Sequence, residues 1–230
     1  MKINFFRIVS FWCGLVLARA IAIAVVMAVS TTVSARLPKE SDLASIVELE
    51  TADFDVQKDG TYTFDYSVRI AILTEAGRES EAVNKVTFNA RASSFQLISA
   101  ATINDGVEIK VAPSNVEIKE VGDSKVFDAN EEVILSFPMV KVGSRLALRY
   151  RLKVHEIPIQ EFFSTGVNID LQNRDVFRRK MRSQIPLFVS VHDPMGMLQI
   201  KESKEGSRSV VEITNKEKIV SSPRLQELMR

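Results

Sequence analysis

Residues 62–72 read YTFDYSVRIAI, and apolar and polar side chains alternate along almost the whole stretch. Successive side chains of a β-strand point to opposite faces, so this order gives a strand with one apolar and one polar face. Such a strand is typical of a sheet that packs a core on one side only. The apolar face would carry Tyr62, Phe64, Tyr66, Val68, Ile70 and Ile72, and the polar face Thr63, Asp65, Ser67, Arg69 and Ala71.

The same period-two pattern recurs along the chain. Phe54 and Val56 share a face just before Lys58-Asp59-Gly60, whose Asp-Gly pair favours a tight hairpin. Residues 146–154 form a second long alternating strand. Residues 181–191 form a third, and Pro186, which cannot donate a backbone hydrogen bond, places it at a sheet edge or a bulge. Shorter strands are expected at residues 83–89, 95–103, 107–111, 133–137, 198–202 and 210–214.

Turn residues separate these strands. Asn104-Asp105-Gly106 and Lys204-Glu205-Gly206 mark two further hairpins, and residues 117–132 predict a long surface loop with room for a short edge strand. After residue 35, no stretch keeps a convincing helical period over about three turns. Many strands joined by turns, without helices between them, predict an all-β fold, an antiparallel β-sandwich of two packed sheets.

A charged corner, LTEAGRESEA, follows the first strand at residues 73–82. Gly77 supplies backbone freedom for the chain to reverse, and the charges of Glu75, Arg78, Glu79 and Glu81 solvate the turn. We therefore interpret this corner as a turn without catalysis.

The two ends of the chain differ from the alternating middle. Residues 1–35 carry Lys2, Arg7 and Arg19, no acid, and an apolar block that ends in small residues up to Ala35, which predicts a signal peptide cleaved after Ala35. The alternative is an uncleaved anchor over residues 11–29, interrupted by Arg19. Ser222-Pro223 is a suitable helix start, so residues 216–230 are expected to be a linker or a short C-terminal helix.

The composition indicates the cellular compartment of the chain and limits the catalytic chemistry available to it. Cleavage would leave 195 residues with 27 Lys+Arg against 29 Asp+Glu, a net charge of −2 that argues against binding to nucleic acid or to an anionic membrane surface. The one cysteine, Cys13, lies in the signal segment and lacks the residues that precede a lipid-modified cysteine. An exported chain without disulfides or a glycosylation sequon fits a bacterial envelope, in the periplasm or beyond, and excludes thiol catalysis.

The residues that most often carry chemistry form no recognisable pattern. His155 ends a strand and His192 precedes a turn, and neither has further ligands at metal-binding spacing. Asp53, Asp55 and Asp59 superficially resemble a calcium loop, but the spacing to Gly60 and the missing acid at Tyr66 favour a hairpin. No catalytic, cofactor-binding or metal-binding residue is predicted, and no cofactor.

One basic cluster and several carboxylates are the remaining candidates for a binding or catalytic role. On a strand, the cluster would be split between two faces, and we interpret it as a solvated, charge-protected edge rather than an anion site. Pairs of carboxylates for glycoside hydrolysis cannot be recognised from one chain, because their members can lie far apart. The cluster comprises Arg174, Arg178, Arg179, Lys180 and Arg182, and the available acids are Glu75, Glu79, Glu81, Glu131 and Glu132.

Three strings together resemble a known family: ILTEAGRESEA at 72–82, ISAATINDGVEIKV at 98–111 and VILSFPMVKVGSRLALRYRL at 133–152. The chain is similar, over roughly residues 45–215, to the uncharacterised all-β domain that precedes transglutaminase-like domains in bacterial envelope proteins. The matching positions are Leu73, Thr74 and Gly77 in the first string, Ala101, Thr102, Ile103, Asp105 and Gly106 in the second, and Phe137, Pro138, Val140, Gly143, Ser144 and Tyr150 in the third.

The resemblance implies a domain architecture but no mechanism. Residues 36–215 would form the β-sandwich, and the Cys-His-Asp site of a transglutaminase core has no counterpart in the 195 residues after Ala35. Two hypotheses follow. The chain is an exported, non-catalytic module that binds or scaffolds a protein or glycan partner in the envelope, or it is the truncated front part of a transglutaminase-like protease or amidase.

Overall fold

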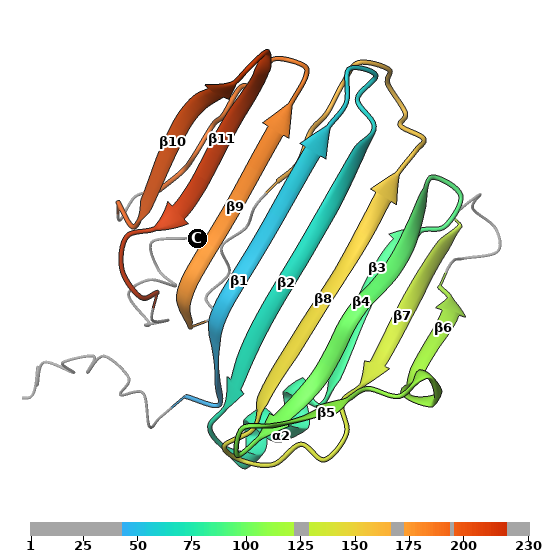
Figure 1. Ribbon diagram of the computed structural model, residues 1–230, viewed down its shortest axis with the longest axis vertical. Helices are drawn as coiled ribbons and strands as arrows, with labels where there is room; N and C mark the ends of the chain where they lie inside the picture. The colour runs from blue at the N-terminus through green and yellow to red at the C-terminus, as the bar shows by residue number, and fades with distance from the viewer. Residues whose placement is uncertain (1–42, 122–128, 167–172, 194–195, 220–230) are drawn as a thin grey trace, which may run out of the picture. The chain divides into compact units, whose positions relative to one another are not determined.

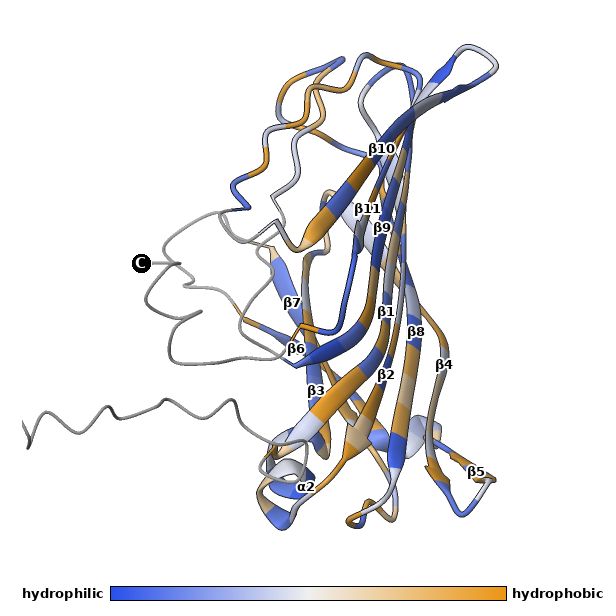
Figure 2. Ribbon diagram, turned by 90° about the vertical axis from the view of Figure 1, so that its left-hand side faces the viewer, coloured by the Kyte–Doolittle hydropathy of each residue, from blue (hydrophilic) through white to orange (hydrophobic). Residues whose placement is uncertain are grey.

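The computed structural model describes residues 43–121, 129–166, 173–193 and 196–219, all within one compact unit, Leu37–Arg230. These residues form two β-sheets that pack on each other, which confirms the predicted β-sandwich (Figures 1 and 2). The predicted signal peptide, residues 1–35, and the predicted helix after Ser222-Pro223 lie outside the described residues.

The large sheet has eight strands in the spatial order β10-β11-β9-β1-β2-β8-β4-β5, and the small sheet has three in the order β3-β7-β6 (Figure 1). The large sheet contains β1 (Ser45–Val56), β2 (Tyr62–Ile72), β4 (Ser93–Asn104), β5 (Val107–Lys110), β8 (Arg145–Val154), β9 (Arg174–Ser183), β10 (Leu198–Glu205) and β11 (Arg208–Asn215). The small sheet contains β3 (Val83–Asn89), β7 (Asn130–Ser136) and β6 (Val116–Glu120), which follows the short 3-10 helix η2 (Pro113–Asn115).

The small sheet covers one side of the large sheet, and Figure 2 shows it there edge-on. We call this side the covered face and the opposite side the open face. All three predicted hairpins form, and Gly60, Gly106 and Gly206 each take a positive φ in them, of +90°, +84° and +64°. The edge strand expected within residues 117–132 corresponds to β6.

One strand pair departs from the antiparallel prediction. β9 pairs with β1 in parallel, with Val47 opposite Arg174 and Val56 opposite Ser183. The chain leaves β8 at one end of the sheet and enters β9 at the other end, so β8 and β9 run in the same direction (Figure 1). Because β1 also runs in that direction, β9 pairs with it in parallel. A pairing between segments more than a hundred residues apart leaves no trace in local alternation.

The predicted strand at residues 181–191 is wrong, and so is its place at an edge. β9 ends at Ser183 and lies inside the sheet, between β11 and β1. Its ladder stops because β1 turns away at Val56, whose carbonyl accepts the last bond from the Gln184 amide. Residues 185–189 join no ladder, yet the side chains of Ile185, Leu187 and Val189 pack on the core as the alternation predicted.

The charged corner after β2 is a helix rather than an open turn. α2 (Glu75–Glu81) spans seven residues, and the side-chain hydroxyl of Thr74 caps it by accepting a hydrogen bond from the Gly77 amide. Seven residues are too few to show a helical period, so local periodicity could not predict this helix. Among the described residues, no helix is long and apolar enough to cross a membrane.

Two apolar cores lie on the covered face. The first fills the space between the two sheets and includes Val47, Val68, Ile72, Val86, Leu135, Leu146, Leu148 and Tyr150. The second lies under the loops at residues 155–166 and 184–193, where the large sheet extends beyond the small one (Figure 2), and includes Ala52, Phe54, Val56, Phe177, Met181, Val211 and Ile213.

Candidate functional site

A row of polar side chains separates the two cores on the covered face. Ala52 of β1 lies opposite Tyr66 of β2 and opposite Arg179 of β9, and Tyr66 in turn lies opposite Tyr150 of β8. Directly paired residues place their side chains on the same face of a sheet. The small side chain of Ala52 therefore leaves room for Arg179 and the two tyrosines to meet.

An ion pair lies beside this row. Nε of Arg174 lies 2.9 Å from a carboxylate oxygen of Glu50, and the side chains are 7% and 11% exposed. The Tyr66 hydroxyl also hydrogen-bonds to the Glu50 carboxylate. We call Glu50, Tyr66, Arg174 and Arg179 the polar seam. A buried carboxylate is tolerated here because a cation neutralises it and a hydroxyl donates to it.

The pKa values of the seam follow from burial and from these neighbours. Burial raises the pKa of Tyr66 well above its usual value, and the negative charge of Glu50 raises it further. Burial likewise raises the pKa of Tyr150 to about 12, with Glu50 as the second cause. For Arg179, burial lowers the pKa while the charge of Glu50 opposes this change. Both tyrosines are hydroxyl donors at any physiological pH.

A cavity of about 350 Å³ opens beside the seam, between β1, β2, α2 and β3. Its wall includes the carboxylate of Glu81, which accepts a 2.9 Å hydrogen bond from the Ser45 hydroxyl. Carboxylates, amides and hydroxyls at one cavity can bind a polar ligand through several hydrogen bonds. The polar side chains that line it are Ser45, Glu50, Tyr66, Glu81, Asn84 and Asn173.

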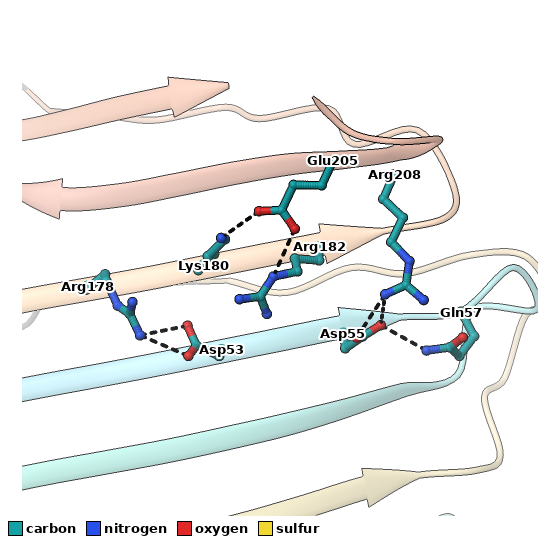
Figure 3. A network of polar contacts seen from close by, with 8 residues as sticks. All are labelled: Asp53, Asp55, Gln57, Arg178, Lys180, Arg182, Glu205 and Arg208. Atoms are coloured by element: carbon teal, nitrogen blue, oxygen red, sulfur yellow. Dashed lines mark hydrogen bonds and ion pairs between the residues drawn. The ribbon is translucent and has the colours of Figure 1, made fainter. Parts of the chain in front are cut away.

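The basic cluster of β9 is split between the two faces, as the alternation predicted, but not at an edge. Arg174 and Arg179 lie on the covered face, and Arg178, Lys180 and Arg182 lie on the open face, where carboxylates neutralise them (Figure 3). The Arg178 guanidinium lies 2.9 Å from Asp53, and Lys180 lies 2.8 Å from Glu205. These pairs join strands of the large sheet rather than form an anion site: Arg178 reaches the neighbouring β1, and Lys180 reaches across β11 to β10.

The three aspartates of the first hairpin do not converge on a metal. Asp53 and Asp55 pair with Arg178 and Arg208 on the open face (Figure 3), while Asp59 accepts hydrogen bonds from Thr61 in the turn. Within residues 43–121, 129–166, 173–193 and 196–219, no three His, Cys, Asp or Glu side chains lie close enough to hold a metal ion.

The two histidines and most of the candidate carboxylates lie apart from the seam. The His155 ring contacts the carbonyl oxygen of Arg91 at 3.1 Å, and His192 is exposed. Glu75 pairs with Arg78 on α2, and Glu132 pairs with Lys85 across the small sheet. Only Glu81 of the five candidates lines the cavity.

Sequence reasoning missed Glu50 and Tyr66 as site residues. A signal for Glu50 was present, because it keeps the same parity as Ala52, Phe54 and Val56 and therefore faces the core. An acid in phase with a core face indicates a buried carboxylate with a partner. The partner itself, Arg174, could not be found, since it arrives through the long-range parallel pairing of β1 with β9.

The three motif strings meet at one end of the sandwich. The Ser144 hydroxyl donates to the Asn104 side chain at 2.5 Å, and the Asn104 amide donates to the Met139 carbonyl at 3.0 Å. The Ile72 amide donates to the Ser144 carbonyl at 2.9 Å. The motif residues at these corners therefore hold the ends of strands together, whereas Tyr150 of the third string lies opposite Tyr66 and Glu81 of the first string lines the cavity.

The chain belongs to the DUF3857 family, a domain of unknown function with solved structures, whose model matches residues 58–217. No curated protein matches the sequence. A crystal structure of a "putative protease" from Parabacteroides distasonis ATCC 8503 is similar in fold, with a TM-score of 0.61 and 12% identity over 79% of this chain. An M1 zinc metallopeptidase from Deinococcus radiodurans aligns over 78% of this chain with a TM-score of 0.35 and 9% identity.

The chain spans 37% of the length of the Parabacteroides protein and 41% of the Deinococcus enzyme. At these identities, the Parabacteroides structure establishes the fold alone. The family assignment confirms the resemblance to a domain of unknown function.

Proposed function

We propose that this chain is an exported, non-catalytic β-sandwich module of a bacterial envelope that binds a protein partner on its covered face. The signal-like residues 1–35 and the absence of cysteine after Ala35 support the compartment. The observation that supports binding most directly is the cavity of about 350 Å³ next to a buried carboxylate, tyrosine and arginine.

The arrangement suits recognition better than turnover. The charge of Glu50 is neutralised by Arg174, and the carboxylate of Glu81 accepts a hydrogen bond from the Ser45 hydroxyl. A general acid or base needs a proton that it can exchange with a substrate. Carboxylates that are already engaged in this way position other side chains and accept hydrogen bonds from a ligand.

Site-specific photo-crosslinking in the bacterium tests the proposal. A photoreactive amino acid replaces Asn84 at the cavity, and the matched control replaces Gln96, which is exposed on the open face. We expect a discrete protein adduct from position 84 that excess purified chain competes away, and none from position 96. Equal adducts from both positions, or none from either, would contradict a binding site on the covered face.

Export and catalysis are tested separately. Mass spectrometry of the chain purified from the cell envelope should give a first residue of Arg36; recovery of the full-length chain in the cytoplasm would contradict export. The purified chain should leave casein and soluble peptidoglycan fragments unchanged. Turnover that the Glu50→Gln variant abolishes would establish an enzyme instead.

A second candidate is that the chain is the front part of a transglutaminase-like protease or amidase. The observation in its favour is that a domain of this fold makes up only 37% of the Parabacteroides protein, so it occurs within longer chains. Translation of the DNA after codon 230 in all three frames tests this candidate. An open frame with a Cys, followed by a His and an Asp, would support it, and unrelated sequence would exclude it.

A further inference from the structure

The polar seam carries one more positive charge than negative charge. Glu50 is its single carboxylate, and Arg174 already pairs with it at 2.9 Å. Arg179 forms no ion pair with any described residue, and its Nε is buried without a hydrogen-bond acceptor. Arg179 is half-buried and shares the charge of Glu50 with Arg174, and its buried Nε donor carries a desolvation cost that an acceptor on a ligand would offset.

The Arg179 guanidinium is also held in place. It lies over the Phe54 ring at 5.5 Å, and its Nη1 donates to the Gly166 carbonyl at 3.2 Å. These contacts use one face of the guanidinium plane and one of its five N–H groups. A fixed guanidinium with unused donors matches a carboxylate, which can accept two parallel hydrogen bonds from it.

We propose that Arg179 is the anchor of a carboxylate-binding subsite, and that its occupant is an acidic side chain on an extended segment of a protein partner. This inference rests on the proposed function, because it names the chemistry by which the covered face recognises its partner. The incoming carboxylate supplies the negative charge that the seam lacks. Tyr66 and Glu50 lie on the same face of the sheet and close enough to Arg179 to act on its charge.

The surroundings of Arg179 favour a protein segment over an acidic sugar. The loop at residues 155–166 supplies Gly166 and also Phe163, whose ring lies 5.7 Å from the ring of Phe54. The same loop exposes Ile159 and Phe162, which are 61% and 54% exposed. Exposed aliphatic and aromatic side chains, here on the loop whose last residue holds the Arg179 guanidinium, are typical of protein interfaces. We therefore expect an acidic residue with apolar neighbours.

Nuclear magnetic resonance of the arginine Nε–Hε groups tests the subsite directly in the folded chain. The probes are the peptide acetyl-Phe-Glu-Phe-amide, its Gln counterpart, sodium galacturonate and sodium phosphate, each compared with sodium chloride at equal ionic strength. Arg178, the residue directly before Arg179 on the same strand, is the matched control. Its Nε is also buried without a hydrogen-bond partner, but Asp53 neutralises its charge on the open face.

We expect the Arg179 signal to shift saturably with the Glu peptide and the Arg178 signal to stay in place. The Gln peptide should bind about tenfold more weakly or worse, since a charge-assisted hydrogen bond contributes about 1.5–3 kcal/mol. The Arg179→Met variant should lose the response, and Arg179→Lys should weaken it. The measurement on the unaltered chain stands even where Arg179→Met fails to fold.

Several results would overturn the proposal. They are an Arg179 signal that ignores the Glu peptide, one that moves equally with chloride, and one that moves equally with the Gln peptide. A stronger response to galacturonate or phosphate would assign the subsite to a sugar acid or a phosphate and reject the protein segment. A crosslink from position 84 that persists unchanged in Arg179→Met would reject the subsite while leaving the binding module intact, whereas the absence of any crosslink rejects the module itself.

Discussion

The backbone carbonyl oxygen of Ala44 lies 2.0 Å from the position that a β-carbon on Gly77 would occupy. The same oxygen accepts hydrogen bonds from the amides of Leu73 and Thr74, at 3.0 and 3.2 Å. Gly77 therefore allows the close approach of α2 to Ala44, in the chain that enters β1. The structure has a helix at this residue, where the sequence predicted a turn.

Gly77→Ala should destabilise the chain. Alanine favours a helix by about 1 kcal/mol over glycine. The clash with Ala44 must move α2 and weaken the hydrogen bonds to that carbonyl, which costs more, so we expect a net loss of about 2 kcal/mol or more. Urea unfolding followed by circular dichroism measures it. Gly166→Ala, where a β-carbon meets nothing within 4 Å, is the control; equal midpoints for the two variants would contradict this explanation.

Local alternation predicted most strands because a two-residue period can be read from a few neighbours. It predicted the β1–β2 hairpin, β4, β7, β8 and the last hairpin, and it failed where the cause is non-local. β9 continues past residue 181 in the pattern but stops at Ser183, because β1 has ended. The parallel pair β1–β9 and the division of strands between two sheets depend on segments far apart in the chain.

The candidate site was less predictable than the fold. In the sequence, Glu81 is one of several available acids and Arg174 and Arg179 belong to the basic cluster, but no local pattern joins them. They come together through cross-strand registers such as Ala52 with Tyr66 and Ala52 with Arg179. A buried acid in phase with a core face, as Glu50 is, was the one local sign.

Ser144→Ala should cost about 2–3 kcal/mol of stability. Ser144 is fully buried, donates to Asn104 at 2.5 Å and accepts from the Lys141 amide at 2.9 Å. Alanine leaves both partners unsatisfied in a dry site, which costs more than the hydrogen bonds contribute. Thermal melting measures the loss. Ser94→Ala, an exposed serine on β4, should change the melting temperature little; a similar small effect at Ser144 would refute its role in joining two corners.

The alkaline titration of the tyrosines should be displaced upward. Burial raises the pKa of Tyr62, Tyr66 and Tyr150, which are the chain's three tyrosines, and raises that of Tyr150 to about 12. Absorbance near 295 nm should therefore stay low through about pH 10, where free tyrosine ionises. A midpoint near the value for free tyrosine, with the chain still folded, would show that these hydroxyls are not buried.

The same shifts imply a loss of stability at high pH. Above about pH 10 the unfolded chain releases the tyrosine protons while the folded chain retains them, so the unfolded state binds fewer protons and stability falls as pH rises. For Tyr150 the loss extends from about pH 10 to about 12, at up to about 1.4 kcal/mol per pH unit. Urea unfolding at a series of pH values measures the slope. Tyr150→Phe should reduce the slope by one group.

Glu50 and Arg174 should be strongly coupled in a double-mutant cycle. Removal of one partner leaves the other charge in a site where both side chains are almost fully buried, which typically costs about 3–5 kcal/mol. We expect Glu50→Gln and Arg174→Met each to show a large loss in urea unfolding. The double variant should be more stable than the sum of the two losses predicts, because it buries no unpaired charge.

The pair Asp65 and Arg151 gives the matched control on the open face of the same sheet. Two hydrogen bonds of 2.6 and 2.9 Å join it, so its geometry is at least as good, but its side chains are 41% and 46% exposed. Water solvates either charge when the other is removed, and the coupling should stay below about 1 kcal/mol and fall with added salt. Equal couplings for the two pairs would mean that the polar seam is open to water. In that case water would also solvate the charge of Arg179, which lies beside Glu50, and a carboxylate ligand would not be required to neutralise it.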